Sequence, residues 1–88
     1  MEKLNVKQCG WTVSTANLDV MKMQEAAGIY RICDEFWFKN KEECTVSING
    51  SEFGVVEAGM GIYFEKGGVD SFVVKEANKT FYFRYTYR

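Results

Sequence analysis

The sequence contains no histidine and no proline among its 88 residues. Without histidine there is no imidazole to act as a general base or to activate a serine or cysteine nucleophile. Without proline there is no proline-rich ligand segment, and turns must rely on Gly, Asn, Asp and Ser. The absence of histidine points away from common hydrolytic sites and favours a non-enzymatic protein, for which we assign no catalytic, metal-binding or cofactor-binding residues.

Cysteine is also scarce, with three residues at Cys9, Cys33 and Cys44. The number is odd, the spacing fits no zinc site, and no Cys-x-x-Cys redox motif is present. We therefore expect reduced thiols in a cytosolic compartment, with Cys33 and Cys44 acting as small buried hydrophobic residues. One disulfide with a spare thiol is the alternative.

Neither sign of charge dominates, since 11 basic and 12 acidic residues give a net charge of −1. Proteins that bind nucleic acid normally carry a basic excess or stripe, so no nucleic-acid partner is expected. No secretory signal follows Lys3 and no apolar run reaches transmembrane length, which predicts a cytoplasmic protein with no membrane partner. A small net charge suits a subunit of an assembly.

Alternating apolar residues dominate the chain from Glu35 onward. Phe36 and Phe38, followed by Cys44, Val46 and Ile48, predict an antiparallel hairpin over Glu35–Ile48 with one apolar face. The Asn49-Gly50 dipeptide that follows predicts a type I′ turn, because both of its central residues require positive φ.

Further strands are predicted after this turn. They comprise Phe53–Val56, a strand carrying Met60, Ile62 and Phe64, the segment Val69–Lys75 with Phe72 and Val74 inward, and a last strand with Phe81, Phe83, Tyr85 and Tyr87 inward. Five or six strands at a spacing of roughly 8–12 residues are typical of a small β-sandwich or barrel. The aromatic last strand would aggregate as a bare edge, so we expect it to pair on both sides. The predicted fold is a single, mainly antiparallel all-β domain over residues 1–88.

The first 34 residues are more ambiguous. Leu4–Lys7 and Gly10–Ser14 are consistent with two strands. Asn17–Ala27 fits either a short helix that ends at Gly28 or a strand. Helix propensity favours the former, and the absence of a capping box after Ser14 or Thr15 favours the latter.

Three aromatic residues, Trp37, Tyr63 and Tyr82, fall on the opposite phase of their strands from the core-facing phenylalanines. If that face is open, they form a row suited to a protein interface or to stacking on a sugar. If another element covers it, they are part of the core. Single-stranded nucleic acid binding by stacking fits the weak charge poorly. These three residues are the candidate interface or ligand surface.

Several stretches also resemble a known group of proteins. They are Asp34-Glu35-Phe36-Trp37-Phe38-Lys39-Asn40, Thr45-Val46-Ser47-Ile48-Asn49-Gly50, Ala58-Gly59, Ser71-Phe72-Val73-Val74-Lys75-Glu76 and the closing aromatic strand. Together they resemble small β-sandwich structural or accessory proteins of tailed bacteriophages and prophages, over about the last 55 residues. The resemblance implies a head-decoration, connector or tail-associated subunit that binds copies of itself or a larger shell protein.

Two other functions remain open at this stage. A carbohydrate- or ligand-binding module would use Trp37, Tyr63 and Tyr82 as its platform. A hydrolase would need carboxylates such as Asp34 and Glu57 to meet across a cleft. The leading expectation is a non-enzymatic virion protein that works through protein–protein contacts and forms a homo-oligomer or a larger assembly.

Overall fold

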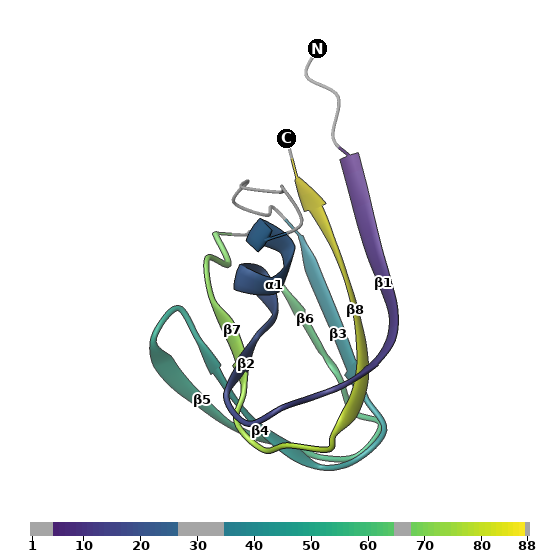
Figure 1. Ribbon diagram of the computed structural model, residues 1–88, viewed down its shortest axis with the longest axis vertical. Helices are drawn as coiled ribbons and strands as arrows, with labels where there is room; N and C mark the ends of the chain where they lie inside the picture. The colour runs from purple at the N-terminus through teal and green to yellow at the C-terminus, as the bar shows by residue number, and fades with distance from the viewer. Residues whose placement is uncertain (1–4, 27–34, 65–67, 88) are drawn as a thin grey trace.

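Two four-stranded antiparallel sheets face each other in the computed structural model, which describes residues 5–26, 35–64 and 68–87 (Figure 1). Sheet A has the order β1-β8-β3-β6, with β1 Asn5–Val13, β8 Thr80–Tyr87, β3 Phe36–Asn40 and β6 Ile62–Phe64. Sheet B has the order β2-β7-β4-β5, with β2 Leu18–Asp19, β7 Phe72–Val74, β4 Cys44–Ile48 and β5 Ser51–Val56. The helix α1, Val20–Ala26, follows β2 directly. The predicted small β-sandwich is confirmed.

The core lies between the two sheets and is largely aromatic. Phe72 of β7 contacts Phe36 and Phe38 of β3, with ring centroids 4.8 Å apart in both pairs. Nine of the predicted inward residues are at most 2% exposed: Phe36, Phe38, Cys44, Val46, Phe72, Val74, Phe81, Phe83 and Tyr85. Ile48, Ile62 and Phe64 are partly buried against this core, and the Tyr87 side chain lies outside the described part of the structure. Burial of this apolar area is the main stabilising contribution to the fold.

The predicted hairpin over Glu35–Ile48 is wrong, although both of its strands exist. β3 pairs with β6 and β8, whereas β4 pairs with β5 and β7, so the chain crosses from one sheet to the other after Asn40. An alternating pattern specifies which face of a strand is buried. The pattern is the same whether two strands pair within one sheet or lie in two sheets that face each other, so it does not distinguish these arrangements.

Asn40 holds this crossing in place through its buried side chain. Its Nδ2 donates to the backbone oxygens of Glu42, Val56 and Glu57 at 2.8, 3.0 and 3.0 Å. Its Oδ1 accepts from the Gly61 amide at 3.2 Å. Gly61 has φ of +69°, and a Cβ there would lie 2.6 Å from the Phe38 oxygen, so glycine is required at this contact.

The Asn49-Gly50 turn is confirmed, because both residues have positive φ, 51° and 81°, and Ile48 pairs with Ser51 across it. β5 contains the predicted return strand Phe53–Val56. Two neighbouring strands are shorter than predicted. β6 excludes Met60, which lies in the preceding turn and is 70% exposed. β7 covers only Phe72–Val74 of the predicted segment Val69–Lys75.

The ambiguous segment Asn17–Ala27 contains both predicted alternatives, a two-residue strand and then a helix. The helix begins after Asp19, whose Oδ1 accepts from the Met21 and Lys22 amides at 3.0 and 3.3 Å. Asp19 is therefore the N-cap that the search for a capping box at Ser14 and Thr15 missed. Ser71 Oγ donates to the same carboxylate at 2.8 Å and ties the cap to the loop before β7.

The N-terminal segment forms one strand, β1, instead of the two that were predicted. β1 pairs with β8, and β8 pairs with β3 on its other side. The prediction that the last strand pairs on both sides is therefore confirmed, with β8 in the interior of sheet A.

Candidate functional site

A row of three side chains crosses the outer face of sheet A in direct register. Trp37 on β3 pairs with Arg84 on β8 and with Tyr63 on β6. The Arg84 guanidinium carbon lies 4.2 Å from the centroid of the Trp37 ring. The Tyr63 ring stacks on Trp37 with centroids 5.1 Å apart and an interplanar angle of 28°. Because β8 and β6 flank β3, the indole is covered from opposite sides.

A second group lies beside this row, around Tyr82. Tyr82 pairs with Lys39 across the β8–β3 ladder and makes an edge-to-face contact with Trp11 of β1, with centroids 4.7 Å apart. The Lys41 ammonium lies 4.5 Å from the centre of the Trp11 ring. Trp11 remains 51% exposed, so this group presents a large aromatic surface to solvent.

The structure places all three predicted residues, Trp37, Tyr63 and Tyr82, on this outer face. Tyr63 is 49% exposed, and Trp37 and Tyr82 are half-buried by their neighbours on the face. Trp37 and Tyr63 contact each other, whereas Tyr82 contacts Trp11 instead. Tyr63 also donates a hydrogen bond from its hydroxyl to Glu35 at 3.0 Å.

Trp11 is the residue of this face that sequence reasoning missed, and a β-bulge is the reason. Cys9 pairs with Phe83 and Thr12 pairs with Phe81, so Gly10 and Trp11 together oppose the single residue between those partners. In a regular strand Trp11 would share the inward face with Cys9. The extra residue turns it outward, and Gly10 beside it is the only local signal.

A groove runs between the two tryptophans. It has a volume of about 330 Å³ and is lined by Gln8, Gly10, Trp11, Trp37, Tyr82 and Arg84. A second hollow of about 250 Å³ shares Trp37 and Tyr82 with the groove and extends towards Met60 and Tyr63. We call the surface formed by the residues that line the groove and the hollow, which include Lys39, together with Lys41, the aromatic face.

Three cations of the aromatic face are free of ion pairs among the described residues. Within residues 5–26, 35–64 and 68–87, Lys39, Lys41 and Arg84 form no ion pair, since the one pair found there joins Lys75 to Glu52. Glu35 and Glu42 add two negative charges beside these cations, and each is held by a neutral donor. Glu35 accepts from Tyr63, and Glu42 accepts from the Thr80 amide at 3.1 Å.

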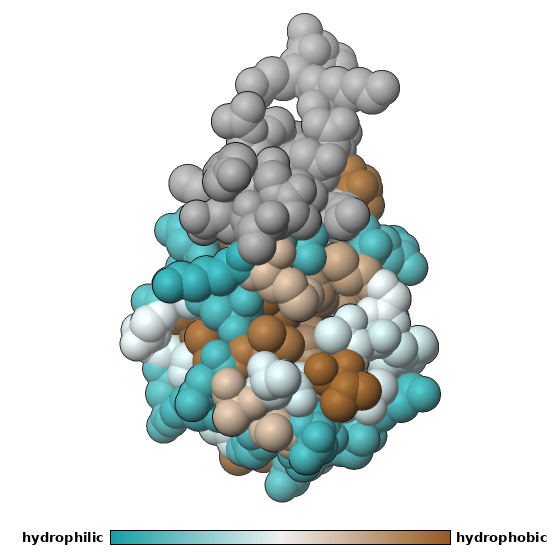
Figure 2. All heavy atoms as spheres, in the orientation of Figure 1, coloured by the Kyte–Doolittle hydropathy of each residue, from teal (hydrophilic) through white to brown (hydrophobic). Residues whose placement is uncertain are grey.

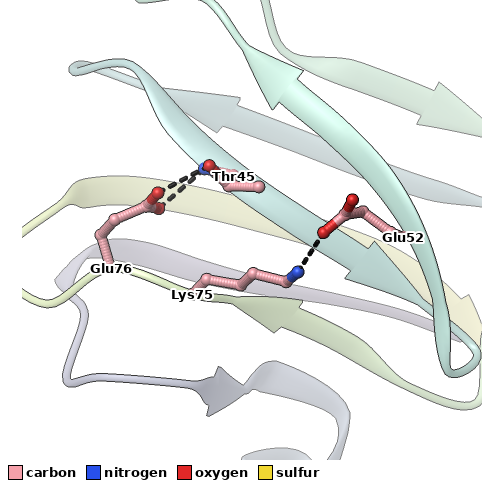
Figure 3. Close-up of polar contacts among 4 residues, drawn as sticks. All are labelled: Thr45, Glu52, Lys75 and Glu76. Carbon is pink, nitrogen blue, oxygen red and sulfur yellow. Dashed lines mark hydrogen bonds and ion pairs between the residues drawn. The ribbon is translucent and has the colours of Figure 1, made fainter.

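Sheet B differs in character, because polar side chains directly after β7 bind to β4 and β5. Figure 3 shows the Glu76 carboxylate bound to Thr45, whose amide and hydroxyl donate to it at 2.7 and 2.6 Å, and the ion pair of Lys75 with Glu52. Burial raises the pKa of Glu76, but the Thr45 hydrogen bonds outweigh it and leave the pKa below its usual value. The hydrogen bond from Lys75 lowers the pKa of Glu52.

Apolar residues also reach the surface on the side of the molecule that Figure 2 shows. Figure 2 shows hydrophobic residues towards the middle of the view, with hydrophilic residues on both sides of them. Scattered apolar surface of this kind is ordinary in soluble proteins and assigns no function by itself.

Cys44 lies in the core and is 2% exposed. Burial, and then the Glu76 charge, raise the pKa of the Cys44 thiol to about 11, which confirms Cys44 as a buried apolar residue. Cys33 and Asp34 lie outside the described residues.

No group of three or more His, Cys, Asp or Glu side chains within the described ranges could hold a metal ion. No helix in those ranges is long and apolar enough to span a membrane.

Comparison with known proteins adds no further constraint. A scan against protein-family models, a search of curated proteins and a search of solved structures each found no match. The function is therefore argued from the aromatic face.

Proposed function

We propose that this protein is a non-enzymatic subunit that binds another protein chain through the aromatic face of sheet A. The observation that carries the proposal is the arrangement Arg84–Trp37–Tyr63. Both faces of the Trp37 ring are already in contact with neighbours, so the ring offers its edge to a partner and not a free face. A tryptophan edge held in this way packs against side chains better than it stacks on a sugar or a base.

The composition of the face supports the same function. Tryptophan, tyrosine and arginine are enriched at protein interfaces and dominate their binding energy. The contacts among Trp11, Trp37, Tyr63, Tyr82 and Arg84 hold these side chains in place before a partner arrives. Less conformational entropy is then lost on binding.

The resemblance to phage and prophage proteins supplies the biological setting of the proposal. In that setting the protein is a head-decoration, connector or tail-associated subunit, made in the host cytoplasm and incorporated into the virion. Its partner is a second copy of itself or a larger shell protein. Genes for capsid, portal or tail proteins beside this gene would support the setting, and metabolic genes would oppose it.

Light scattering and binding to assembled phage heads test the proposal. We expect either self-association that increases with concentration or retention on heads, and Trp37→Ala should weaken it about tenfold or more, as for a hot-spot residue. Phe53→Ala is the control, because Phe53 is 53% exposed and lies outside the aromatic face. A monodisperse monomer that does not bind heads would contradict the proposal.

A carbohydrate- or ligand-binding module is the second candidate, and Trp11 is the observation that favours it. Trp11 is half-exposed at the margin of the groove, where a sugar ring could stack on it. Titration of the tryptophan fluorescence with a panel of glycans tests this function, with Trp11→Phe as the variant that should lose the response. A flat response in the folded protein would remove this candidate.

A further inference from the structure

We infer that the groove between Trp11 and Trp37 binds an acidic segment of the partner chain, with a carboxylate at Arg84 and an apolar side chain between the two tryptophans. This inference rests on the proposed function, because it names the chemistry of the partner that the aromatic face recognises. It follows from the positions of Arg84, the two lysines and Gly10.

Arg84 is arranged to receive an anion. The face of its guanidinium lies against Trp37, which leaves the N–H groups along its edge directed into the surroundings. Gln8 is its cross-strand partner in the β1–β8 ladder, and both residues line the groove. No hydrogen bond joins either of these two side chains to another residue in the part of the chain that the structure describes. An arginine in this position pairs well with a carboxylate, often through two hydrogen bonds.

The two lysines extend the positive charge beyond Arg84. Lys41 lies over Trp11, at the other aromatic wall of the groove, and Lys39 lines the adjoining hollow. Lys39, Lys41 and Arg84 form no ion pair within the described residues. The carboxylates of Glu35 and Glu42 stay negative, because their donors, the Tyr63 hydroxyl and the Thr80 amide, are neutral. Three cations against these two carboxylates leave an excess of one positive charge on this side of a chain whose net charge is −1. Charge complementarity therefore favours an acidic partner, and it determines specificity and association rate in such contacts.

The shape of the groove favours a polypeptide over a nucleic acid. Single-stranded nucleic acid binds by stacking successive bases on open aromatic faces. Here Trp37 is covered on both sides and one side of Trp11 is under Lys41, so consecutive stacking platforms are lacking on these two rings. A volume of about 330 Å³ is at the lower end of the range for ligand pockets and suits one or two side chains.

Gly10 leaves the groove open and offers a test that spares the fold. It lines the groove at the β-bulge, and a Cβ added there would meet no atom within 4 Å. Gly10 does not have a positive φ, unlike several other glycines of the chain, so the backbone conformation at this position also suits a residue with a side chain. Valine favours strand structure, so Gly10→Val should fill part of the groove without destabilising the protein.

The experiment measures binding of fluorescent eight-residue peptides that alternate Asp or Glu with Phe, Leu or Trp. Matched peptides with Lys in place of the acids and a ten-residue oligothymidine are the comparison probes. We expect the acidic peptides to bind, to bind more weakly as salt is raised from about 0.05 to about 0.5 M, and to lose about tenfold in affinity with Arg84→Gln. Gly10→Val should abolish binding and keep the unfolding midpoint of the original protein.

Several results would overturn the inference. One is that the acidic peptides do not bind. Another is that the lysine peptides or the oligothymidine bind as tightly as the acidic peptides or more tightly. A third is that Gly10→Val binds the acidic peptides with unchanged affinity. If the acidic peptides fail while self-association or head binding still depends on Trp37, the inference is wrong and the proposed function stands. If neither depends on the aromatic face, both are wrong.

Discussion

Phe38 and Phe72 belong to different sheets, yet their ring centroids lie only 4.8 Å apart at the centre of the core. Phe72 makes an equally close contact with Phe36, so one side chain of sheet B packs against two of sheet A. The packing of the two sheets against each other therefore depends strongly on these three rings.

Replacing Phe38 with alanine should lower the free energy of unfolding by about 3–5 kcal/mol, because a fully buried ring is lost and a cavity remains. Urea denaturation followed by far-UV circular dichroism measures the effect. Met60→Ala is the control, since Met60 is 70% exposed and its truncation should change stability by no more than about 0.5 kcal/mol. Near-normal melting of Phe38→Ala would show that this ring is not part of the core.

Asn40→Ala should destabilise the crossing between β3 and β4 more than an ordinary surface substitution does. The change removes four side-chain hydrogen bonds, and each buried group left without a partner costs about 1–3 kcal/mol. Asn40→Asp is the matched variant, because it keeps the shape but replaces the donor amide with a carboxylate that faces carbonyl oxygens. Urea midpoints within error of the original protein for both variants would contradict this role of Asn40.

The stabilising contribution of Glu76 should depend on pH. Its pKa in the folded protein is below the value of about 4.3 expected in the unfolded chain. The contribution is therefore complete above the unfolded pKa and is lost as the pH falls through the lower, folded pKa. The difference in unfolding free energy between the original protein and Glu76→Gln should be larger at pH 7 than at pH 3. Glu43→Gln, which changes an exposed carboxylate, is the control, and an equal pH dependence for both variants would refute the prediction.

Amide hydrogen exchange should protect consecutive residues along β8, because this strand has neighbours on both sides. β5 is the internal comparison, since it lies at an edge of sheet B and should show protection at alternate residues. Deleting residues 81–88 should abolish folding altogether. Alternate protection along β8, or a folded deletion variant, would be incompatible with the interior position.

Alternation in the sequence predicted the core side chains of β3, β4, β7 and β8, because the period of two is fixed by the geometry of a strand. It did not predict the buried Val20, Val56 and Val69, and it included Met60, which is exposed. It could not predict that β3 and β4 lie in different sheets. That outcome depends on the long-range hydrogen bonds of Asn40 to Val56, Glu57 and Gly61, which no local pattern announces. The Asn49-Gly50 turn could be predicted because its requirement for positive φ is local.

The candidate site was only partly accessible from the sequence for a similar reason. The alternating pattern of their strands predicts that Trp37, Tyr63 and Tyr82 lie on the outer face. Lys39 and Arg84 come two residues after Trp37 and Tyr82, so the same pattern places them on that face. Trp11 could not be placed, because the bulge reverses the face on which it lies. The pairing of β1 with β8, distant in sequence, is what creates that bulge and the groove beside it.

The interior position of β8 has a consequence for the order of events during synthesis. β1 and β3 are made long before the strand that separates them, so a growing chain on the ribosome cannot complete sheet A until residues 80–87 have emerged. The groove also requires Tyr82 and Arg84, which belong to that same strand. A partner that recognises the groove would thus discriminate finished molecules from nascent or truncated ones, and only completed subunits would enter an assembly.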